Sequence, residues 1–281
     1  MKAGMIIGSA LTIGTLTTGA LVFRLATASS DAPQVTVEQS VQQQACEDRD
    51  RGEGDRACVV REITIEAPRG ALTVDGGNNG GIRVFGESRR DVRLVAEVWA
   101  TARDADRAQE LMEEIRIQTD GGMVESDGPE TGRRESWGVS WRVFVPHGTD
   151  LDLTTHNGGI AISEVDGEVR FDALNGGVTL AGMAGDVRGS TVNGGVKVEL
   201  EGMSWDGAGL DVTTVNGGVQ LEMAEGYSAE LETGTVNGRI DTEIAMEVRG
   251  RVSKTLRTQL GDGGAPIRVA TTNGSVQIRA N

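Results

Sequence analysis

Apolar residues alternate with polar ones on both sides of an Asn-Gly pair that recurs through the second half of the chain. When each of these Asn residues is taken as position 0, positions −6 and −4 before it are mostly aliphatic, as are positions +3 and +5 after it. An apolar residue at every second position is the pattern of a β-strand with one buried face. Each repeat is therefore predicted to contribute one strand before its Asn-Gly pair and one strand after it.

The Asn-Gly pairs return at a nearly constant interval. From Asn157 onward, successive Asn residues are 18, 18, 23, 21 and 36 residues apart, and the last interval is twice 18. A fixed period of this kind indicates a repeat architecture. An outlying copy of the motif precedes the series at Asn79. The predicted structural turns are Asn79, Gly80, Asn157, Gly158, Asn175, Gly176, Asn193, Gly194, Asn216, Gly217, Asn237, Gly238, Asn273 and Gly274.

The Asn-Gly corners are predicted to have a structural role. A tight turn needs residues at positive φ, which glycine adopts freely and asparagine tolerates better than most residues. Stacked repeats would also align the Asn side chains into a ladder of amides. Position −5 is charged in every repeat, which predicts a second ladder, of charges, on a solvated sheet face. The residues at this position are Asp152, Arg170, Arg188, Asp211, Glu232 and Arg268.

The pattern predicts an all-β fold, and two architectures satisfy it. One is a β-solenoid, a β-helix-like stack of two-stranded coils of about 18 residues with Asn-Gly corners. The other is an antiparallel β-sandwich or meander, because Asn-Gly between alternating strands is also a strong hairpin signal. The return of one corner at every second turn favours the stack.

One short helix is expected in the N-terminal part, after a capping-box sequence at 101–104. Its apolar face would carry Ala105, Ala108, Leu111, Met112 and Ile115.

The N-terminal residues predict export. Residues 1–28 combine Lys2, a long apolar stretch and a small-x-small sequence at 26–28, which is the pattern of a signal peptide. Because the apolar stretch is long and Arg24 follows it, an uncleaved membrane anchor is the alternative. Residues 29–58 are predicted to be a polar segment and residues 59–281 a β-repeat domain.

The cysteines agree with export. Cys46 and Cys58 are the only two in the chain, and they flank a polar stretch. A lone pair at this spacing in an oxidising compartment predicts a disulfide.

The net charge and the absence of known catalytic motifs exclude several classes of function. The net charge of −15 repels phosphate backbones, which argues against a nucleic-acid partner. The only histidines are His147 and His156, no G-x-S-x-G elbow occurs, and zinc ligands are too few. We therefore predict no catalytic residue, no metal site and no cofactor, and calcium binding is left open because only its known sequence patterns are absent.

The order of these motifs resembles the bacterial "putative adhesin" family of β-strand-repeat proteins, a domain family of unknown function. The shared motifs are the N-G-G corner at 72–84, the A-x-x-A-x-x-L helix, the V-x-V-P strand end at 143–146 and the closing Asn-Gly units at 235–276. The resemblance covers roughly residues 59–281. It implies a β-solenoid-like, adhesin-like domain located in the cell envelope, and it supplies no catalytic residues.

The leading functional hypothesis is a non-catalytic extracytoplasmic scaffold or adhesin-like binding module in the periplasm or on the cell surface. Its partner would be an envelope protein or a glycan, and it would touch the membrane only through an uncleaved N-terminal segment. The alternative is a polysaccharide-active enzyme on a β-helix, recognisable by two or three acids with arginine in one groove. Trp205, in the insertion that lengthens one repeat to 23 residues, is a possible ligand contact or a cover over one end of the core.

Overall fold

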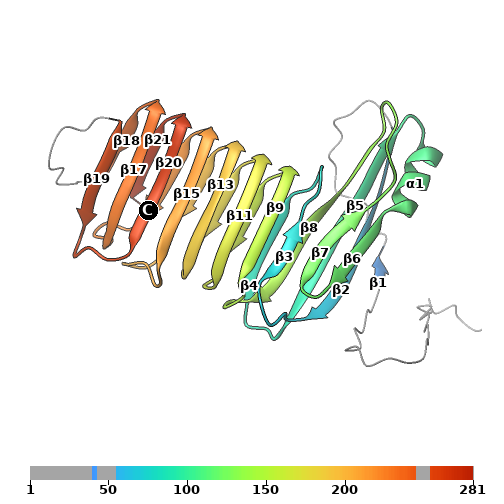
Figure 1. The fold of residues 1–281 in the computed structure, drawn as a ribbon, viewed down its shortest axis with the longest axis horizontal. Helices are drawn as coiled ribbons and strands as arrows, with labels where there is room; N and C mark the ends of the chain where they lie inside the picture. The colour runs from blue at the N-terminus through green and yellow to red at the C-terminus, as the bar shows by residue number, and fades with distance from the viewer. Residues whose placement is uncertain (1–39, 43–54, 245–253, 281) are drawn as a thin grey trace, which may run out of the picture. The chain divides into compact units, whose positions relative to one another are not determined.

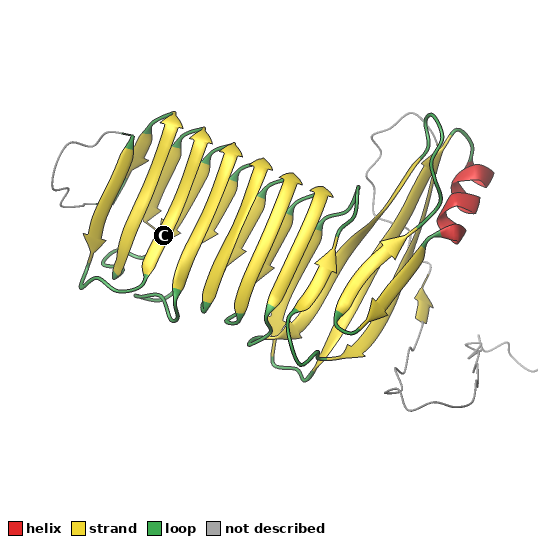
Figure 2. Cartoon of the chain, viewed as in Figure 1, coloured by secondary structure: helices red, strands yellow, loops and turns green. Residues whose placement is uncertain are grey.

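The computed structural model describes residues 40–42, 55–244 and 254–280 (Figure 1). In these residues the fold is all-β with one short helix, α1 (Ala105–Glu114), as the sequence predicted (Figure 2). No helix in this part of the chain is long and apolar enough to cross a bilayer. The export segment 1–28 and Cys46 lie outside the described residues, so the signal and the disulfide stay predictions.

The strands form two large sheets. In spatial order, the eleven-stranded sheet contains β1 (Ser40–Gln42), β2 (Asp55–Glu66), β5 (Asp91–Ala102), β8 (Ser136–Pro146), β4 (Ile82–Glu87), β10 (Ile160–Ser163), β12 (Val178–Ala181), β14 (Val196–Glu199), β16 (Val219–Met223), β21 (Val276–Ala280) and β18 (Ile240–Thr242). The ten-stranded sheet contains β19 (Thr255–Leu260), β17 (Ala229–Asn237), β20 (Pro266–Asn273), β15 (Gly209–Asn216), β13 (Asp186–Asn193), β11 (Glu168–Asn175), β9 (Leu151–Asn157), β3 (Leu72–Asp75), β7 (Met123–Asp127) and β6 (Arg116–Asp120). The predicted boundary between 58 and 59 falls inside β2.

Each repeat places one strand in each sheet and turns at its Asn-Gly corner. Neighbouring repeats pair in parallel and in register, so that Asn175 aligns with Asn157 and Val178 with Val196. The antiparallel meander therefore does not describe the repeats. Antiparallel pairing in the described residues is confined to the ends, where β1, β2, β5 and β8 adjoin, β6 meets β7, and β19 meets β17.

The core lies between the two sheets and is built from the predicted alternating positions. Leu153, Val169 and Val198 are at most 1% exposed. Burial of such side chains is the main driving force for stacking, because each removes apolar surface from water. One repeat carries Gly189 where its neighbours carry a large residue. A Cβ there would lie 2.4 Å from the ring of Phe171, so the phenylalanine fills the space of both positions.

Helix α1 covers the antiparallel end of the core. Ala108, Leu111 and Met112 are its buried residues, as predicted. Of the two other residues of the predicted face, Ala105 is exposed, and Ile115 is buried at the C-cap. The capping box is a correction: Thr101 belongs to β5, and the N-cap is Asp104, whose Oδ1 accepts a 2.9 Å hydrogen bond from the backbone N–H of Arg107. A carboxylate at the N-cap satisfies a backbone donor that the first turn leaves open.

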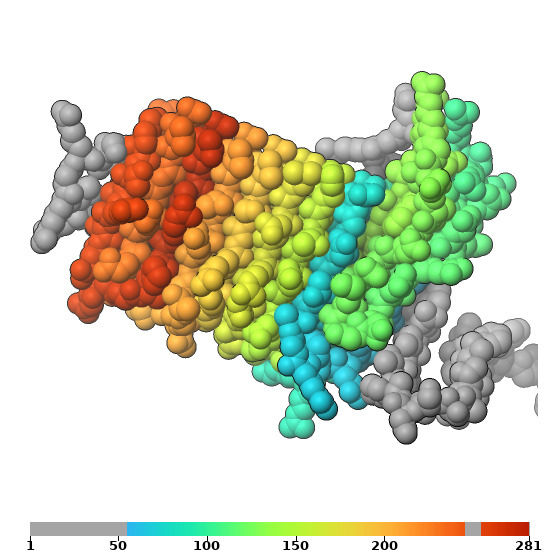
Figure 3. Space-filling view, in the orientation of Figure 1, coloured from blue at the N-terminus to red at the C-terminus, as the bar shows by residue number. Residues whose placement is uncertain are grey.

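The last two repeats are not stacked in sequence order. Strand β20 pairs with β15 on one side and with β17 on the other, and β21 lies between β16 and β18 in the same way. In Figure 3 the red C-terminal band accordingly lies between two orange bands. After β16 the chain therefore leaves one strand position open in each sheet and forms β17 and β18, the repeat that contains Asn237. It then forms β19, and β20 and β21 occupy the two open positions. The interval of 36 residues is this detour, and the reading of it as two units of 18 was wrong.

The other end is also out of sequence order. In the ten-stranded sheet β3 lies between β9 and β7, and in the eleven-stranded sheet β4 lies between β10 and β8. Both β7 and β8 come later in the chain than β3 and β4. Asn79 thereby joins the row of corners beside Asn157.

The corners need glycine for a different reason from the one predicted. Positive φ occurs at other glycines, such as Gly185 and Gly207, but not at Gly194 or the equivalent corner glycines. A Cβ at Gly194 would instead lie 2.0 Å from the carbonyl oxygen of Gly176 in the preceding repeat. Glycine is required there because successive backbones approach too closely for any side chain.

The threonine that stands two residues before most of the corner asparagines also has a structural role. Its side chain points inward, and the Oγ1 of Thr191 donates a 2.7 Å hydrogen bond to the carbonyl of Gly176. Thr155, Thr214 and Thr271 make the same bond to glycines of the adjacent repeat. Each hydroxyl satisfies a carbonyl oxygen that the sheet ladder does not reach.

Candidate functional site

The outer face of the ten-stranded sheet carries three rows of side chains that run across the strands. The charged row consists of Asp152, Arg170, Arg188, Asp211, Arg268, Glu232 and Arg257 in spatial order. The small row consists of Thr154, Asp172, Ser190, Thr213, Ala270 and Gly234. The aliphatic row, beside the Asn-Gly corners, consists of His156, Leu174, Val192, Val215, Thr272 and Val236.

The aliphatic row is unusual because it is apolar and faces solvent. The exposed fractions of Leu174, Val215 and Val236 are 36%, 42% and 61%, and these are three of the five large exposed hydrophobic residues in the described chain. Shallow hollows of about 460 and 400 Å³ lie along the small row, between the aliphatic row and the charged row. Exposed apolar side chains that gather in one place are typical of interaction surfaces.

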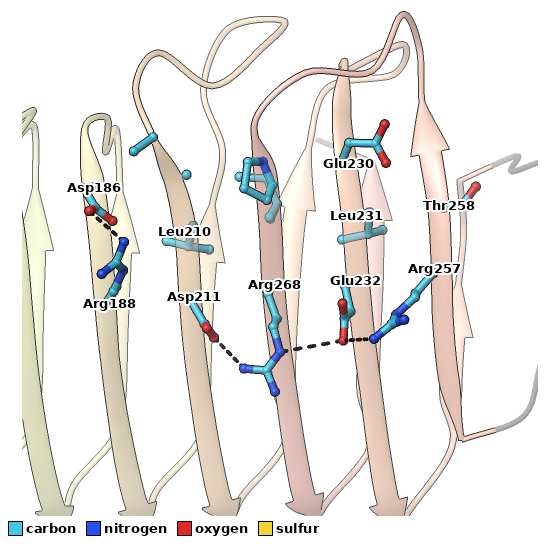
Figure 4. A pocket seen from close by; sticks show the side chains of 14 residues that line it. Asp186, Arg188, Leu210, Asp211, Glu230, Leu231, Glu232, Arg257, Thr258 and Arg268 are labelled. Atoms are coloured by element: carbon cyan, nitrogen blue, oxygen red, sulfur yellow. Dashed lines mark hydrogen bonds and ion pairs between the residues drawn. The ribbon is translucent and has the colours of Figure 1, made fainter.

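A third hollow, the charged groove, has a volume of about 360 Å³ and lies across β13, β15, β20, β17 and β19. Gly209 and Pro266 form a low point in it, between Asp186 on one side and Glu230 on the other. Figure 4 shows the side chains of this groove and the ion pairs that join them from strand to strand.

The ion pairs of the groove depend on the order of the repeats. Arg268 Nη1 lies 2.5 Å from Asp211 Oδ1, and Arg268 Nε lies 3.8 Å from Glu232 Oε1 (Figure 4). Arg257 Nη2 lies 3.0 Å from the same Glu232 oxygen. In sequence order Asp211 would stand beside Glu232, two like charges, whereas insertion of β20 gives alternating charges. Directly opposed unlike charges stabilise a sheet pair, and like charges destabilise it.

The middle of the charged row differs from this alternating part. Arg170 and Arg188 stand side by side in register, and each pairs with a carboxylate on its own strand, Glu168 and Asp186. More than half of each arginine side chain is exposed. Two adjacent guanidinium groups with free edges are suited to carboxylate or other anionic groups of a partner.

The groove contains the combination of acids and arginine that would mark a polysaccharide-active enzyme. Asp211 and Glu232 both contact Arg268. In the described residues no three His, Cys, Asp or Glu side chains are grouped closely enough to hold a metal ion.

The Asn residues of the predicted turns form one continuous amide ladder. The Nδ2 of Asn175 donates to Asn157 Oδ1 at 2.9 Å, and Asn193 donates to Asn175 at 2.8 Å. The same bond links Asn216 to Asn193, Asn273 to Asn216, and Asn237 to Asn273, at 2.7 to 2.8 Å. Because each interior amide donates to one neighbouring repeat and accepts from the other, the ladder holds the corners in register and leaves these amides little freedom to bind a ligand.

Of the two alternatives predicted for Trp205, the structure supports packing against the core and not a ligand contact. The side chain is 7% exposed and its Nε1 donates a 3.0 Å hydrogen bond to the carbonyl of Gly185. The indole therefore belongs to the core and has no open face on which a sugar could stack. Met203, two residues earlier, is the exposed residue of this loop, with 56% of its surface accessible.

The remaining candidates are dispersed. His147 Nδ1 lies 2.7 Å from the carbonyl oxygen of Glu164, while His156 belongs to the aliphatic row, so the two histidines are not part of one cluster. Cys58 lies in β2, opposite Trp99 of β5. The charged row was predicted as a ladder on a solvated face and not as a binding site, while the small and aliphatic rows were not predicted. The repeated apolar residue at position −1 was the available signal for the aliphatic row.

Comparison with known proteins gives structural neighbours only. No protein-family model matches the chain, and no curated protein matches its sequence. A putative cell adhesion protein from Clostridium sporogenes is similar with 11% identity and a TM-score of 0.42, over 79% of this chain and 100% of that chain. A putative lipid binding protein from Parabacteroides distasonis has 8% identity and a TM-score of 0.33, over 78% and 96%. A putative adhesin from Bacteroides fragilis has 11% identity and a TM-score of 0.31, over 80% and 97%. Several of the similar structures are thus named adhesins or cell adhesion proteins.

Proposed function

We propose that this chain is a non-catalytic, extracytoplasmic binding module of β-solenoid type, which holds an envelope protein or glycan along the outer face of its ten-stranded sheet. The observation that carries the proposal is the aliphatic row. A solvated sheet face has no need of Leu174, Val215 and Val236, and their burial in a complex would remove apolar surface from water.

The two other rows complete a surface suited to a long partner. The small row leaves room for the partner's main chain between the aliphatic and charged rows. Arg170 and Arg188 provide anchoring points for anionic groups on that partner. A linear partner that lies across the strands would meet the same pattern once per repeat, so many weak contacts would add up.

The extracytoplasmic location is supported by the signal-like residues 1–28 and by the isolated cysteine pair. The net charge of −15 keeps such a protein soluble and away from nucleic acids. Contact with the membrane would be limited to the N-terminal segment, if that segment is retained.

Co-sedimentation with isolated bacterial envelopes tests the proposal. The full-length protein should sediment with envelopes, and the double variant Leu174→Asn, Val215→Asn should bind at least roughly tenfold more weakly, since two apolar contacts are lost. Met203→Asn is the matched control, because it removes an equally exposed apolar side chain outside the rows. Protease-treated envelopes separate a protein partner from a glycan. Equal binding of the double variant and the wild type would contradict the use of this face.

The enzymatic alternative is supported by the carboxylates and arginine of the charged groove. Its test is the release of reducing ends from envelope polysaccharides by the full-length protein. Release by the wild type that is lost in Asp211→Asn would overturn the non-catalytic proposal.

A further inference from the structure

The amide ladder has two unlike ends. At one end Asn79 Nδ2 donates a 3.1 Å hydrogen bond to the carbonyl of Trp137 in β8, and Gly80 packs so closely that a Cβ would lie 2.0 Å from Val139 O. At the other end Asn237 Nδ2 donates to Asn273 Oδ1 at 2.7 Å. No further repeat follows in the described chain, and the pairing of β19 with β17 stops at Gly234, three residues before Asn237.

Asn-Gly is the dipeptide most prone to spontaneous rearrangement, because glycine lets its backbone nitrogen reach the preceding side-chain amide. The nitrogen must lose its proton, and the asparagine must rotate so that its Cγ approaches it. Both movements are opposed by fixed hydrogen bonds, since each must be broken before attack.

At the interior corners, hydrogen bonds hold both the asparagine side chain and the N–H of the glycine that follows it. Asn216 Oδ1 accepts from Asn273, and its Nδ2 donates to Asn193. The N–H of Gly217 donates to the backbone carbonyl of Asn273 at 3.0 Å. Gly158 and Gly194 are held by the same backbone bond to the following repeat. In contrast, the Asn237 side chain is bound on its Nδ2 side only, within the described residues.

We infer that Asn237-Gly238 is a spontaneous modification site that converts asparagine to aspartate and isoaspartate. The Gly238 nitrogen attacks Asn237 Cγ, a C–N bond forms, the Cγ–Nδ2 bond breaks, and the proton from the glycine nitrogen leaves with the amide as ammonia. Water then opens the five-membered succinimide at either carbonyl. Lys254 Nζ donates a 2.7 Å hydrogen bond to Gly238 O and so places a positive charge on the residue whose nitrogen must become anionic.

The exposure of the asparagine residues does not explain why Asn237 should be modified in preference to the others. Asn157, Asn175, Asn193, Asn216, Asn237 and Asn273 are all exposed, so water reaches each of them. The difference is the number of hydrogen bonds that hold each amide. The product at Asn237 has no Nδ2 donor, so the bond to Asn273 is lost, and isoaspartate adds a backbone methylene at the corner.

Peptide mapping of the aged full-length protein tests the inference. Cleavage after Lys197 and Arg239 releases residues 198–239 as one peptide, which contains both Asn216 and Asn237. In native protein incubated at mildly alkaline pH, Asn237 should convert about tenfold faster than Asn216, as expected when one or two fewer hydrogen bonds must break. In urea the two rates should converge.

The variant Asn273→Ala sharpens the test. It removes the donor to Asn216 Oδ1 and should raise the rate at Asn216 several-fold, while Asn175, two repeats away, stays slow. Equal native rates at Asn216 and Asn237, or a faster rate at Asn216, would overturn the inference.

Discussion

The interior repeats, residues 151–223, and the repeat at the C-terminal end are built from the same motif but assembled differently. In the interior each strand lies beside its predecessor in sequence, and every corner is confined by a neighbour on both sides. At the end, β20 and β21 enter between strands that precede them, and antiparallel β19 forms the edge of the ten-stranded sheet. A stack of parallel coils leaves its last strand with an unpaired edge, and β19 covers that edge of β17. The comparison suggests that regular motifs determine contact geometry, while charge and chain reversal determine where the stack ends.

The largest difference between interior and end should come from the corner glycines. Gly194→Val places a side chain about 2 Å from the carbonyl of Gly176 and should lower the free energy of unfolding by at least about 3 kcal/mol. Gly238→Val meets Gly274 in the same way but faces no further repeat, so it should cost less. Gly195→Ala is the control, because its Cβ would lie 3.4 Å from Gly218 O, an ordinary van der Waals contact. Urea unfolding of the three variants measures the order, and equal losses would show that the corners are not confined as described.

The corner threonines should give the next effect. Thr191→Val keeps the shape but removes the hydrogen bond to Gly176 O, leaving a carbonyl unsatisfied at a cost of about 1 to 2 kcal/mol. Ala173 occupies the same position in the preceding repeat, so Ala173→Thr should raise stability. A Thr191→Val variant as stable as the wild type in chemical denaturation would contradict this role.

The order of the charges at the C-terminal end should affect stability less than the corner residues do, and its effect should depend on the salt concentration. Arg268→Glu puts three acids in a row with Asp211 and Glu232 and should destabilise the protein by about 1 kcal/mol, less in high salt. Arg188→Glu would gain Arg170 as a neighbour of opposite charge, but it would lose its ion pair with Asp186 and stand beside Asp211, so it should cost less than Arg268→Glu. Thermal melting at low and high ionic strength compares them. Salt-independent, equal effects would mean that charge does not contribute to the order of the repeats.

The last effect should be absent at neutral pH and should appear only at alkaline pH, at the C-terminal end. Tyr227, the only tyrosine, lies in the segment that crosses from β16 to β17, and burial raises its pKa to about 12. The unfolded chain ionises near pH 10, so stability from this group is complete below pH 10 and is lost as pH rises toward 12. Absorbance titration of the single phenol measures its pKa directly, and Tyr227→Phe should remove this part of the pH dependence. A phenol that titrates near 10 in the folded protein would contradict its burial.

Much of the fold could be predicted, because the relevant signals are local. Position +3 and position +5 residues such as Val196 and Val198 face the core because side chains alternate along any strand. The amide ladder follows from Asn at a constant interval, once the strands are taken as parallel. The candidate site was harder to predict, because Leu174, Val192 and Val215 become a surface only when three repeats are placed side by side.

The sequence by itself determined the strands, the corners, the aliphatic core and the period, since each depends on residues a few positions apart. Only the tertiary structure decided why the corners need glycine, because the conflict at Gly194 is with a backbone 18 residues earlier. Only the tertiary structure placed Arg268 between Asp211 and Glu232 and buried Trp205 in the core, where it bonds to Gly185. These features depend on which repeats are neighbours, and neighbours are chosen by the sum of backbone pairing, core packing and charge over the whole stack.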